Sequence, residues 1–415
     1  MKKLTKIATL VLSVCFAGQI AFAAGFGLYE FSARGNAMGG AVLAGEAEPA
    51  SLALNPALIT QLPGKQVQLS ATLVTAKIED VEYGSAKTDT DREWWPLPAL
   101  YYTQQLGEKW WLGLGAFTRF GLSNTYSDKG WMLPETGTHS LYHVGVVTYT
   151  VQPTVAYQAT DKLSVAAGLE VQYLNFTEKV NFGNVAHLDL DGDSVAWSGM
   201  LAFFYNANEK VNFGGSFRMR NDHSVRGPVN YEKNLAPSTF VNAGDFWGDI
   251  TFPAQLALGA SYKPTDKWLF EFNWTNIFWS CFRSIDIYFD NVPGGGANPG
   301  MMGTAQGNMK EYQDAYRIGI GAEYTLNDKT KLRGSFIFDK SPINDRFMDV
   351  MLPADDRYIV GLGAGFDLGK NVLLDLSYNI LFVQGLDGVA ADQTTPVDYK
   401  SSISHLMGIS VRYTF

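Results

Sequence analysis

Alternation of apolar and polar side chains is the dominant pattern of this chain from residue 65 to Phe415. Residues 268–275, WLFEFNWT, place four aromatic side chains on one face and Glu271, Asn273 and Thr275 on the other, since successive side chains of a strand point to opposite sides. The same pattern recurs in residues 332–338 and 358–366. A membrane barrel presents apolar side chains outward and polar ones inward, so the pattern predicts such a barrel.

Six short polar segments separate these runs and have the composition of tight turns, with Gly, Asn or Asp where a positive φ is needed. They are residues 106–109, 160–162, 208–210, 265–267, 327–329 and 369–371. Longer irregular stretches alternate with them near 84–93, 121–142, 181–193, 227–246, 291–308, 341–354 and 386–398. Short turns at one rim and long loops at the other are typical of outer-membrane barrels.

The turn count predicts an all-β fold, a membrane-spanning antiparallel barrel of fourteen strands over residues 65–415. The expected strands are 65–83, 94–106, 109–120, 143–159, 162–180, 194–207, 210–226, 247–262, 267–290, 309–325, 330–340, 355–367, 371–385 and 400–415. An even strand count places both ends of the barrel on the short-turn side, which is periplasmic. A segment arriving from the N-terminus could enter the lumen there.

Residues 24–64 lack the alternating pattern that predicts strands elsewhere in the chain. This stretch is rich in Gly and Ala, shows little alternation and contains Asn55-Pro56-Ala57. We expect it to form a small N-terminal hatch that plugs the lumen. The triplet predicts a rigid turn, because the Asn55 side chain can cap backbone groups and Pro56 fixes its own φ and extends the residue before it.

Residues 1–23 have the pattern of a signal peptide: three lysines, a short apolar core and the small-x-small sequence Ala21-Phe22-Ala23. The apolar core is too short to span a bilayer, so export is predicted with the mature chain beginning at Ala24. Loss of the three lysines moves the net charge from −9 to −12. A balance this acidic argues against a nucleic-acid partner.

The cysteine, histidine and aspartate residues form no pattern that indicates a catalytic site. No nucleotide or redox motif indicates a cofactor. Cys281 is the one cysteine that remains after export, which excludes an intrachain disulfide. Four of the five histidines fall in or near the expected outer loops, and His405 lies on the outward phase of the last strand. His187 with Asp189, Asp191 and Asp193 could form a metal site, and the aspartates resemble part of a calcium loop. The downstream glutamate of such a loop is missing, so a solvated loop and no metal site are predicted.

The last expected strand alternates as far as a terminal aromatic residue, Phe415. Such an ending resembles the signal that the outer-membrane barrel-insertion machinery reads, which makes that machinery an expected partner during biogenesis. The apolar outward faces can all be accounted for by contact with outer-membrane lipid. These observations together place the protein in the outer membrane.

Over nearly the whole mature chain, the sequence resembles the FadL family of outer-membrane transporters for long-chain fatty acids and other hydrophobic compounds. The matching segments are 25–30 (GFGLYE), 32–35 (SARG), 55–57 (NPA), 120–122 (FGL) with Tyr126, 252–254 (FPA), 262–268 (YKPTDKW), 352–353 (LP), 356–358 (DRY) and 361–365 (GLGAG). Each segment is short, but their order and spacing follow the family. The resemblance implies a fourteen-stranded barrel with an N-terminal hatch, which agrees with the turn count.

The family route, as the resemblance implies it, runs from extracellular capture to an internal apolar pocket, then hatch movement and lateral exit at a kink in the third strand. The implied gate is Asn55, Pro56 and Ala57. The implied kink residues are Gly115, Phe117, Phe120, Gly121 and Leu122. Glycines in this stretch permit bends that larger residues resist, although they could simply let a barrel wall coil.

Candidate ligand contacts come from an apolar set in an expected outer loop and from arginines on inward phases. The loop set is Trp131, Met132, Leu133 and Leu141, because exposed apolar clusters often mark binding sites. A carboxylate ligand also needs a sheltered cation, for which the candidates are Arg119, Arg317 and Arg357. Most inward arginines, Arg333 included, are expected to pair with lumen acids such as Glu271, Glu323, Asp339 and Asp375.

The substrate is left open between long-chain fatty acids and neutral aromatic hydrocarbons. Family members often carry a Gly-Arg-Tyr-like segment ahead of the fourth strand, where this chain has residues 140–143, SLYH. A general porin is disfavoured because an open pore needs no plug, and an adhesin would rest on loops of undistinctive composition. A hydrolase would need a nucleophile, a base and an orienting group within reach. We see no energy-coupling segment and predict passive uptake.

Overall fold

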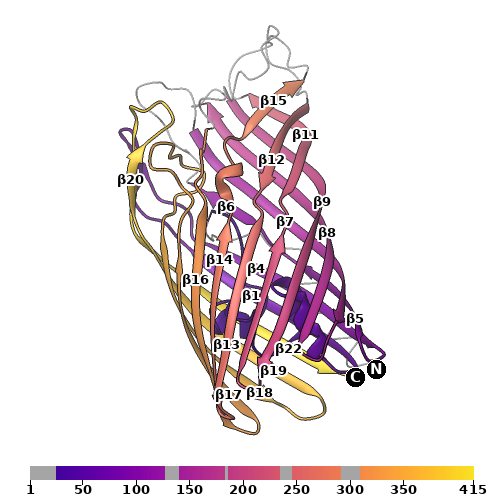
Figure 1. Ribbon diagram of the computed structural model, residues 1–415. Helices are drawn as coiled ribbons and strands as arrows, with labels where there is room; N and C mark the ends of the chain where they lie inside the picture. Colours follow the sequence, from indigo (N-terminus) through magenta and orange to yellow (C-terminus); the bar gives the residue numbers. More distant parts are fainter. Residues whose placement is uncertain (1–24, 127–139, 183–185, 234–244, 291–308) are drawn as a thin grey trace.

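In the computed structural model the chain is a closed antiparallel β-barrel with a short N-terminal segment inside it (Figure 1). The structure describes residues 25–126, 140–182, 186–233, 245–290 and 309–415. Eighteen strand segments form the wall, and four pairs of these continue one another, so the barrel has the fourteen strands predicted from the sequence. The first and last strands pair from Gln66↔Thr414 to Thr75↔His405, which closes the cylinder.

Most strands of the wall lie close to their expected ranges. The uninterrupted ones are β1 (Lys65–Ala76), β4 (Glu93–Leu106), β7 (Ser140–Gln158), β8 (Leu163–Phe182), β9 (Ala186–Asn208), β16 (Ala315–Asn327), β17 (Thr330–Asp339), β18 (Arg357–Asp367), β19 (Val372–Val383) and β22 (Ser402–Thr414). All six predicted tight turns are confirmed, since each joins two paired neighbours in this order.

Four strands are interrupted, which the alternation did not predict. They are β5 (Trp110–Phe117) with β6 (Gly121–Thr125), β10 (Val211–Arg218) with β11 (Asn221–Lys233), β12 (Asp245–Phe252) with β13 (Gln255–Thr265), and β14 (Trp268–Ile277) with β15 (Asp286–Asp290). A short 3-10 helix, η3 (Trp279–Cys281), lies within the last of these breaks. A break in the ladder changes no side chain's polarity, so the alternation of residues does not predict it.

Burial follows the strand alternation, as a barrel with a lipid-facing exterior requires. Along β14, Trp268, Phe270 and Phe272 point outward and are 40–46% exposed, whereas Glu271 and Asn273 point inward and are 3% exposed. The outward faces of the barrel therefore form an apolar belt and the inner wall is polar. None of the helices in the described ranges is long or apolar enough to cross a bilayer.

The outer loops carry a second sheet, which we call the loop sheet. Its strands are β2 (Val81–Tyr83), β3 (Ala86–Thr88), β20 (Leu386–Val389) and β21 (Pro396–Tyr399). The predicted first strand, 65–83, was therefore too long: it ends at Ala76, and Val81–Tyr83 pairs with β21 of the last outer loop instead. This pairing joins segments at opposite ends of the chain, so no local sequence pattern predicts it.

The prediction about the aspartates was wrong. Asp189, Asp191 and Asp193 belong to β9 and not to a loop, because β9 extends outward beyond its predicted start. His143 and His223 lie in β7 and β11, within their expected strands 143–159 and 210–226, and are 8% and 1% exposed. A strand that begins earlier than the alternation indicated explains the error.

Residues 25–64, which we call the N-terminal segment, lie inside the lower part of the barrel near the tight turns (Figure 1). The segment contains helix α2 (Ala33–Ala37) and two 3-10 helices, η1 (Pro49–Ala53) and η2 (Pro56–Gln61). Ser32 caps α2 by accepting a hydrogen bond from the backbone N–H of Gly35 at 2.9 Å. Most of its side chains are buried against the inner wall.

Candidate functional site

The backbone pairing of the wall is interrupted at the break in the third strand. β4 and β5 pair from Leu106↔Trp110 to Leu100↔Ala116, and beyond this point the ladder stops. Within residues 90–126 the two strands meet again at the isolated bridge Thr90↔Tyr126. Side chains replace the missing ladder in part: the Glu93 carboxylate accepts hydrogen bonds from Ser123 Oγ at 3.1 Å and Trp95 Nε1 at 3.0 Å.

The N-terminal segment pairs with the interrupted strand at its bend. The backbone N–H of Leu28 donates to the carbonyl of Arg119 at 2.7 Å, and that of Gly121 donates to the carbonyl of Phe26 at 2.8 Å. These two bonds bracket the bridge Gly27↔Phe120. Backbone groups that the wall leaves unpaired are thus satisfied from inside the lumen. Any displacement of Phe26–Leu28 must break these bonds.

Phe26 sits at the centre of what we call the aromatic cluster. Its ring centroid lies 4.8 Å from Trp279, 5.3 Å from Phe282, 5.6 Å from Phe252 and 6.3 Å from Phe120, each in edge-on geometry. Phe120, Phe252 and Trp279 stand at the interruptions of three different strands. Three of the four breaks in the wall therefore meet at one side chain of the N-terminal segment.

Above the aromatic cluster lies a small apolar pocket with a cavity of about 20 Å³. It is lined by Phe26, Val144, Val146, Phe176, Ile250, Phe282, Ile285, Lys310, Tyr312, Asp349, Met351 and Leu352. Lys310 is 3% exposed and forms an ion pair with Asp349, and its ammonium also approaches Met351 Sδ at 3.1 Å. The cavity holds about one water as it stands, so a larger ligand requires side chains to move.

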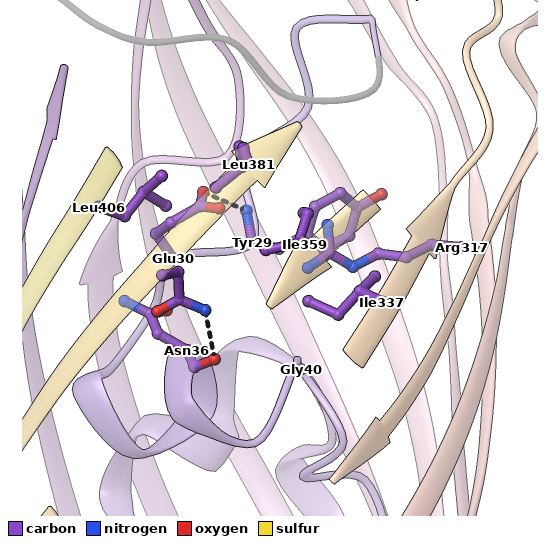
Figure 2. A pocket seen from close by; sticks show the side chains of 10 residues that line it. Tyr29, Glu30, Asn36, Gly40, Arg317, Ile337, Ile359, Leu381 and Leu406 are labelled. Atoms are coloured by element: carbon purple, nitrogen blue, oxygen red, sulfur yellow. Dashed lines mark hydrogen bonds between the residues drawn. The ribbon is translucent and has the colours of Figure 1, made fainter. Parts of the chain in front are cut away.

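A second cavity, of about 10 Å³, lies between the N-terminal segment and strands β16, β17, β18, β19 and β22 (Figure 2). Arg317 borders it, with its guanidinium 4.6 Å from the centre of the Tyr29 ring. The half-buried Glu30 faces the same space, and one of its oxygens accepts a hydrogen bond from the backbone N–H of Tyr29 at 2.8 Å. This space is also too small for anything beyond a water.

The predicted lumen arginines are paired with acids in the structure. Arg119 contacts Glu170 at 2.8 Å, while Arg317 and Arg357 share Asp339 at 3.2 and 3.5 Å. Arg333 contacts Glu323 at 2.7 Å and Asp375 at 2.5 Å. Glu271 differs, because it accepts a hydrogen bond from the backbone N–H of Ala44.

The apolar loop set is only partly visible. Trp131, Met132 and Leu133 lie outside the residues that the structure describes. Leu141, at the start of β7, packs against the main apolar core. Of the kink residues, Gly115 and Phe117 lie in β5, Gly121 and Leu122 begin β6, and Phe120 falls in the break between them.

Asn55 holds the centre of the N-terminal segment against the wall. Its side-chain amide donates to the carbonyls of Leu43 at 2.6 Å and Phe203 at 2.9 Å, and its oxygen accepts from the backbone N–H of Ala57 at 3.1 Å. It thereby caps η2, with Pro56 at the first position. At the other end, Arg34 of α2 contacts Glu323 at 3.2 Å. The segment is therefore polar where it is anchored and aromatic at Phe26.

The sequence reasoning missed Lys310, Asp349 and Phe26. Lys310 sits where a strand was expected to begin, but the strand starts at Ala315 and residues 309–314 run irregularly. Asp349 belongs to an expected outer loop, 341–354. A lysine next to an apolar strand was the one available signal, and it is not distinctive without the partner.

Protonation of Glu30 is expected to favour the packed N-terminal segment. Burial raises the pKa of this carboxyl above its usual 4.5, while Arg317, the hydrogen bond from Tyr29 and Arg357 oppose the rise. The packed state therefore binds the proton more tightly than a state in which the segment is displaced. The free energy that this proton contributes to the packed state is fully present below the usual pKa and is lost as the pH rises through the raised pKa. We expect a cysteine at Leu28 to be labelled faster by a thiol reagent as pH rises, in a Cys281→Ser background.

The matched variant is Glu30→Gln, which should make this labelling, corrected for the reagent's own pH dependence, constant between about pH 4 and pH 8. Glu79→Gln, at an exposed carboxyl of an outer loop, is the control and should leave the profile unchanged. A pH profile that persists in Glu30→Gln would assign the effect to another group.

Curated relatives resemble the chain over nearly its full length. The 47 kDa outer membrane protein of Pasteurella multocida is 23% identical over 429 residues, covering 95% of each chain. The long-chain fatty acid transport protein of Salmonella typhi is 20% identical over 439 residues, covering 93% of each. The similarity therefore includes both the N-terminal segment and the barrel.

Solved structures share the fold. A Pseudomonas aeruginosa FadL homologue superposes with a TM-score of 0.79 at 15% identity, covering 94% of this chain and all of that one. The Pseudomonas putida toluene transporter TodX gives a TM-score of 0.71 at 20% identity, covering 94% and 99%. A family model described as outer membrane protein transport protein (OMPP1/FadL/TodX) matches residues 14–415. The chain therefore belongs to the OMPP1/FadL/TodX family of outer membrane transport proteins.

Proposed function

We propose that the protein takes up long-chain fatty acids passively, with Lys310 as the group that binds the carboxylate. As a member of its family it is an outer-membrane transporter of hydrophobic compounds and not an enzyme. The fatty-acid assignment goes further and rests on one observation, the buried Lys310 in an apolar pocket.

An amphipathic acid needs an apolar surface for its chain and a sheltered cation for its head group. The pocket supplies aromatic and aliphatic side chains on all sides of the Lys310–Asp349 pair. Removal of an alkyl chain from water contributes about 25 cal/mol per Å2. A ligand carboxylate would take the place of Asp349, so that the lysine remains paired at every stage. Arg119, Arg317 and Arg357 do not line this apolar pocket, which makes them weaker candidates.

The route that we propose continues through the N-terminal segment as a hatch. Phe26 lines the pocket and also pairs, through its carbonyl, with the bend of the third strand. A ligand that displaces Phe26 would break the pairing of residues 26–28 with 119–121. The gap beside β4 would then lead sideways into the lipid. Asn55, Pro56 and Ala57 would either stay bound to the wall or move together with residues 26–28. Capture would occur at the outer loops, where Trp131, Met132 and Leu133 are the candidates.

A disulfide between Gly27→Cys and Phe120→Cys should block uptake without preventing binding. The two residues are an antiparallel bridge pair, whose Cα separation suits a disulfide. In a Cys281→Ser background, the oxidised protein should bind oleate with the affinity of the reduced one, and cells carrying it should lose at least about nine-tenths of uptake, since the link prevents the movement. Reduction should restore transport.

The reduced double variant is the internal control, because it carries the same two substitutions. Uptake that continues at the reduced rate after oxidation would contradict hatch movement at this contact. Loss of uptake in both forms would instead point to the missing Phe120 ring.

A neutral aromatic hydrocarbon is the second candidate substrate, and the aromatic cluster favours it. Four aromatic rings around Phe26 offer edge-on contacts that suit a benzene ring. Saturable binding of oleate that weakens without Lys310 supports the acid. Saturable binding of toluene alone would keep the same route and move the substrate to hydrocarbons.

A further inference from the structure

A buried polar cluster lies in the wall beside the aromatic cluster, and its residues are distinct from those that line the Lys310 pocket. It consists of Gln172 on β8 with Asn221 and His223 on β11, each no more than 1% exposed. Gln172 Oε1 accepts a hydrogen bond from Asn221 Nδ2 at 3.1 Å and lies 3.1 Å from His223 Nε2. Because a carboxamide oxygen only accepts, His223 donates from Nε2 and its Nδ1 is an acceptor.

Two acceptors of this cluster have no hydrogen-bond partner, namely His223 Nδ1 and Asn221 Oδ1. The residues are two apart on the inward face of β11 and bind the same glutamine oxygen, so their free acceptors belong to one small region. Buried polar groups are almost always paired, and each exception needs an explanation. A pair of free acceptors can receive a hydrogen bond from a ligand that donates.

The surroundings favour a neutral donor over a cation. Glu170, two residues from Gln172 on the same face, is already bound by Arg119, Arg218 and Ser198. The two guanidinium groups oppose the approach of an ammonium ion. On the other side, the His223 ring lies 5.3 Å from the Phe252 ring, which stacks on Phe120 at 4.2 Å. The site is thus polar at one end and aromatic at the other.

The wall is also incomplete next to this cluster. β10 pairs with β9 as far as Arg218↔Met200, followed by a bond from the Met219 N–H to the Gly199 carbonyl. Pairing resumes at Arg226↔Asp193 with the register shifted by one residue. Residues 220–225 therefore have no ladder to β9, and Asn221 and His223 lie in this stretch. A ligand could approach the cluster through the wall as well as from the lumen.

We propose that Asn221 and His223 bind the hydroxyl group of a neutral ligand, such as a phenol or a long-chain alcohol, with its apolar part against Phe252. The proposal rests on the uptake of hydrophobic compounds and adds hydroxylated ones as a substrate class with their own binding site. The hydroxyl donates to His223 Nδ1 or Asn221 Oδ1, and no bond is made or broken in the ligand.

The test compares binding of octylphenol and octylbenzene to the full-length protein in detergent, by quenching of tryptophan fluorescence. The native protein should prefer the phenol by about tenfold, the value of one well-formed hydrogen bond at a buried site. Asn221→Leu and His223→Phe should each reduce this preference to about threefold or less, with octylbenzene affinity unchanged. His223→Gln, which keeps an acceptor, should retain most of the preference.

His143→Phe is the matched control, because His143 is also buried, at 8% exposed, but both its ring nitrogens have partners, Thr125 Oγ1 at 3.0 Å and Thr177 Oγ1 at 3.3 Å. Folding of each variant is checked by its heat-modifiable gel mobility, and His223→Gln carries the test if His223→Phe does not fold. A phenol preference that persists in both Asn221→Leu and His223→Phe would contradict this hydroxyl site but not the proposed uptake function. A native protein that binds neither probe would contradict the uptake function and with it the site.

Discussion

Replacing Phe26 with alanine is expected to raise the affinity for toluene by about tenfold or more. The substitution empties a space bounded by Phe120, Phe252, Trp279 and Phe282, which now surround the ring at 4.8 to 6.3 Å. Apolar cavities of this kind stay dry and bind small aromatic molecules. Loss of a buried Phe side chain costs about 3–5 kcal/mol, part of which a ligand of the same shape recovers.

Fluorescence of Trp279, next to the vacated space, supplies the measurement. Phe31→Ala is the control, because Phe31 belongs to the same segment and packs edge-on against Phe117 at 5.3 Å, but lines neither cavity. It removes equal volume outside the space bounded by these four rings, so it should leave the toluene-dependent fluorescence change of Trp279 near the native value. A weaker affinity in Phe26→Ala would mean that this ring helps to bind the ligand and does not occupy its place.

Lys310→Met is expected to weaken the binding of oleate by about tenfold to a hundredfold while leaving a long-chain alcohol within about threefold of its native affinity. Methionine keeps most of the apolar stem and removes the charge, so the loss reports the interaction with the carboxylate. The variant also leaves Asp349 without its cation in an apolar pocket. Some loss of stability is therefore expected, and binding is compared well below the unfolding temperature.

Two further variants separate the charge at this pocket from charge in general. Lys340→Met removes a lysine that pairs with Asp356 at 3.1 Å and is half exposed, and it should leave oleate binding unchanged. Lys310→Arg keeps the charge and should retain most of the affinity if the pocket can hold the larger group. Equal weakening of acid and alcohol in Lys310→Met would show that the stem matters and the charge does not.

The barrel could be predicted because its determinants are local. Alternation sets the face of each strand, and short polar segments such as 106–109 and 327–329 fix the tight turns, so strand number and direction follow from neighbouring residues. Inward arginines could be expected to pair with acids for the same reason, and Arg317 and Arg333 do so. Errors in strand ends, as at Ala76, arose where a loop continued the alternation.

The site could not be predicted because its contacts join distant segments. Lys310 pairs with Asp349, which belongs to residues 341–354, a segment that the sequence predicted to be an outer loop. Phe26 contacts rings at the breaks of three different strands. Each of these residues is unremarkable among its sequence neighbours. The interruption at Phe120 is likewise defined by its pairing with Gly27, and the glycines nearby indicated only that a bend was permitted.

The loop sheet has a consequence for how the barrel assembles. Glu82 and Tyr83 pair with Asp398 and Val397, so one half of the sheet follows the first strand and the other half precedes the last. Contacts this remote in sequence form late, because a long loop must close before they are gained. The sheet can therefore appear only once the β1–β22 seam is nearly complete, and afterwards it opposes separation of that seam. A barrel of this design would be slow to close and slower still to come apart.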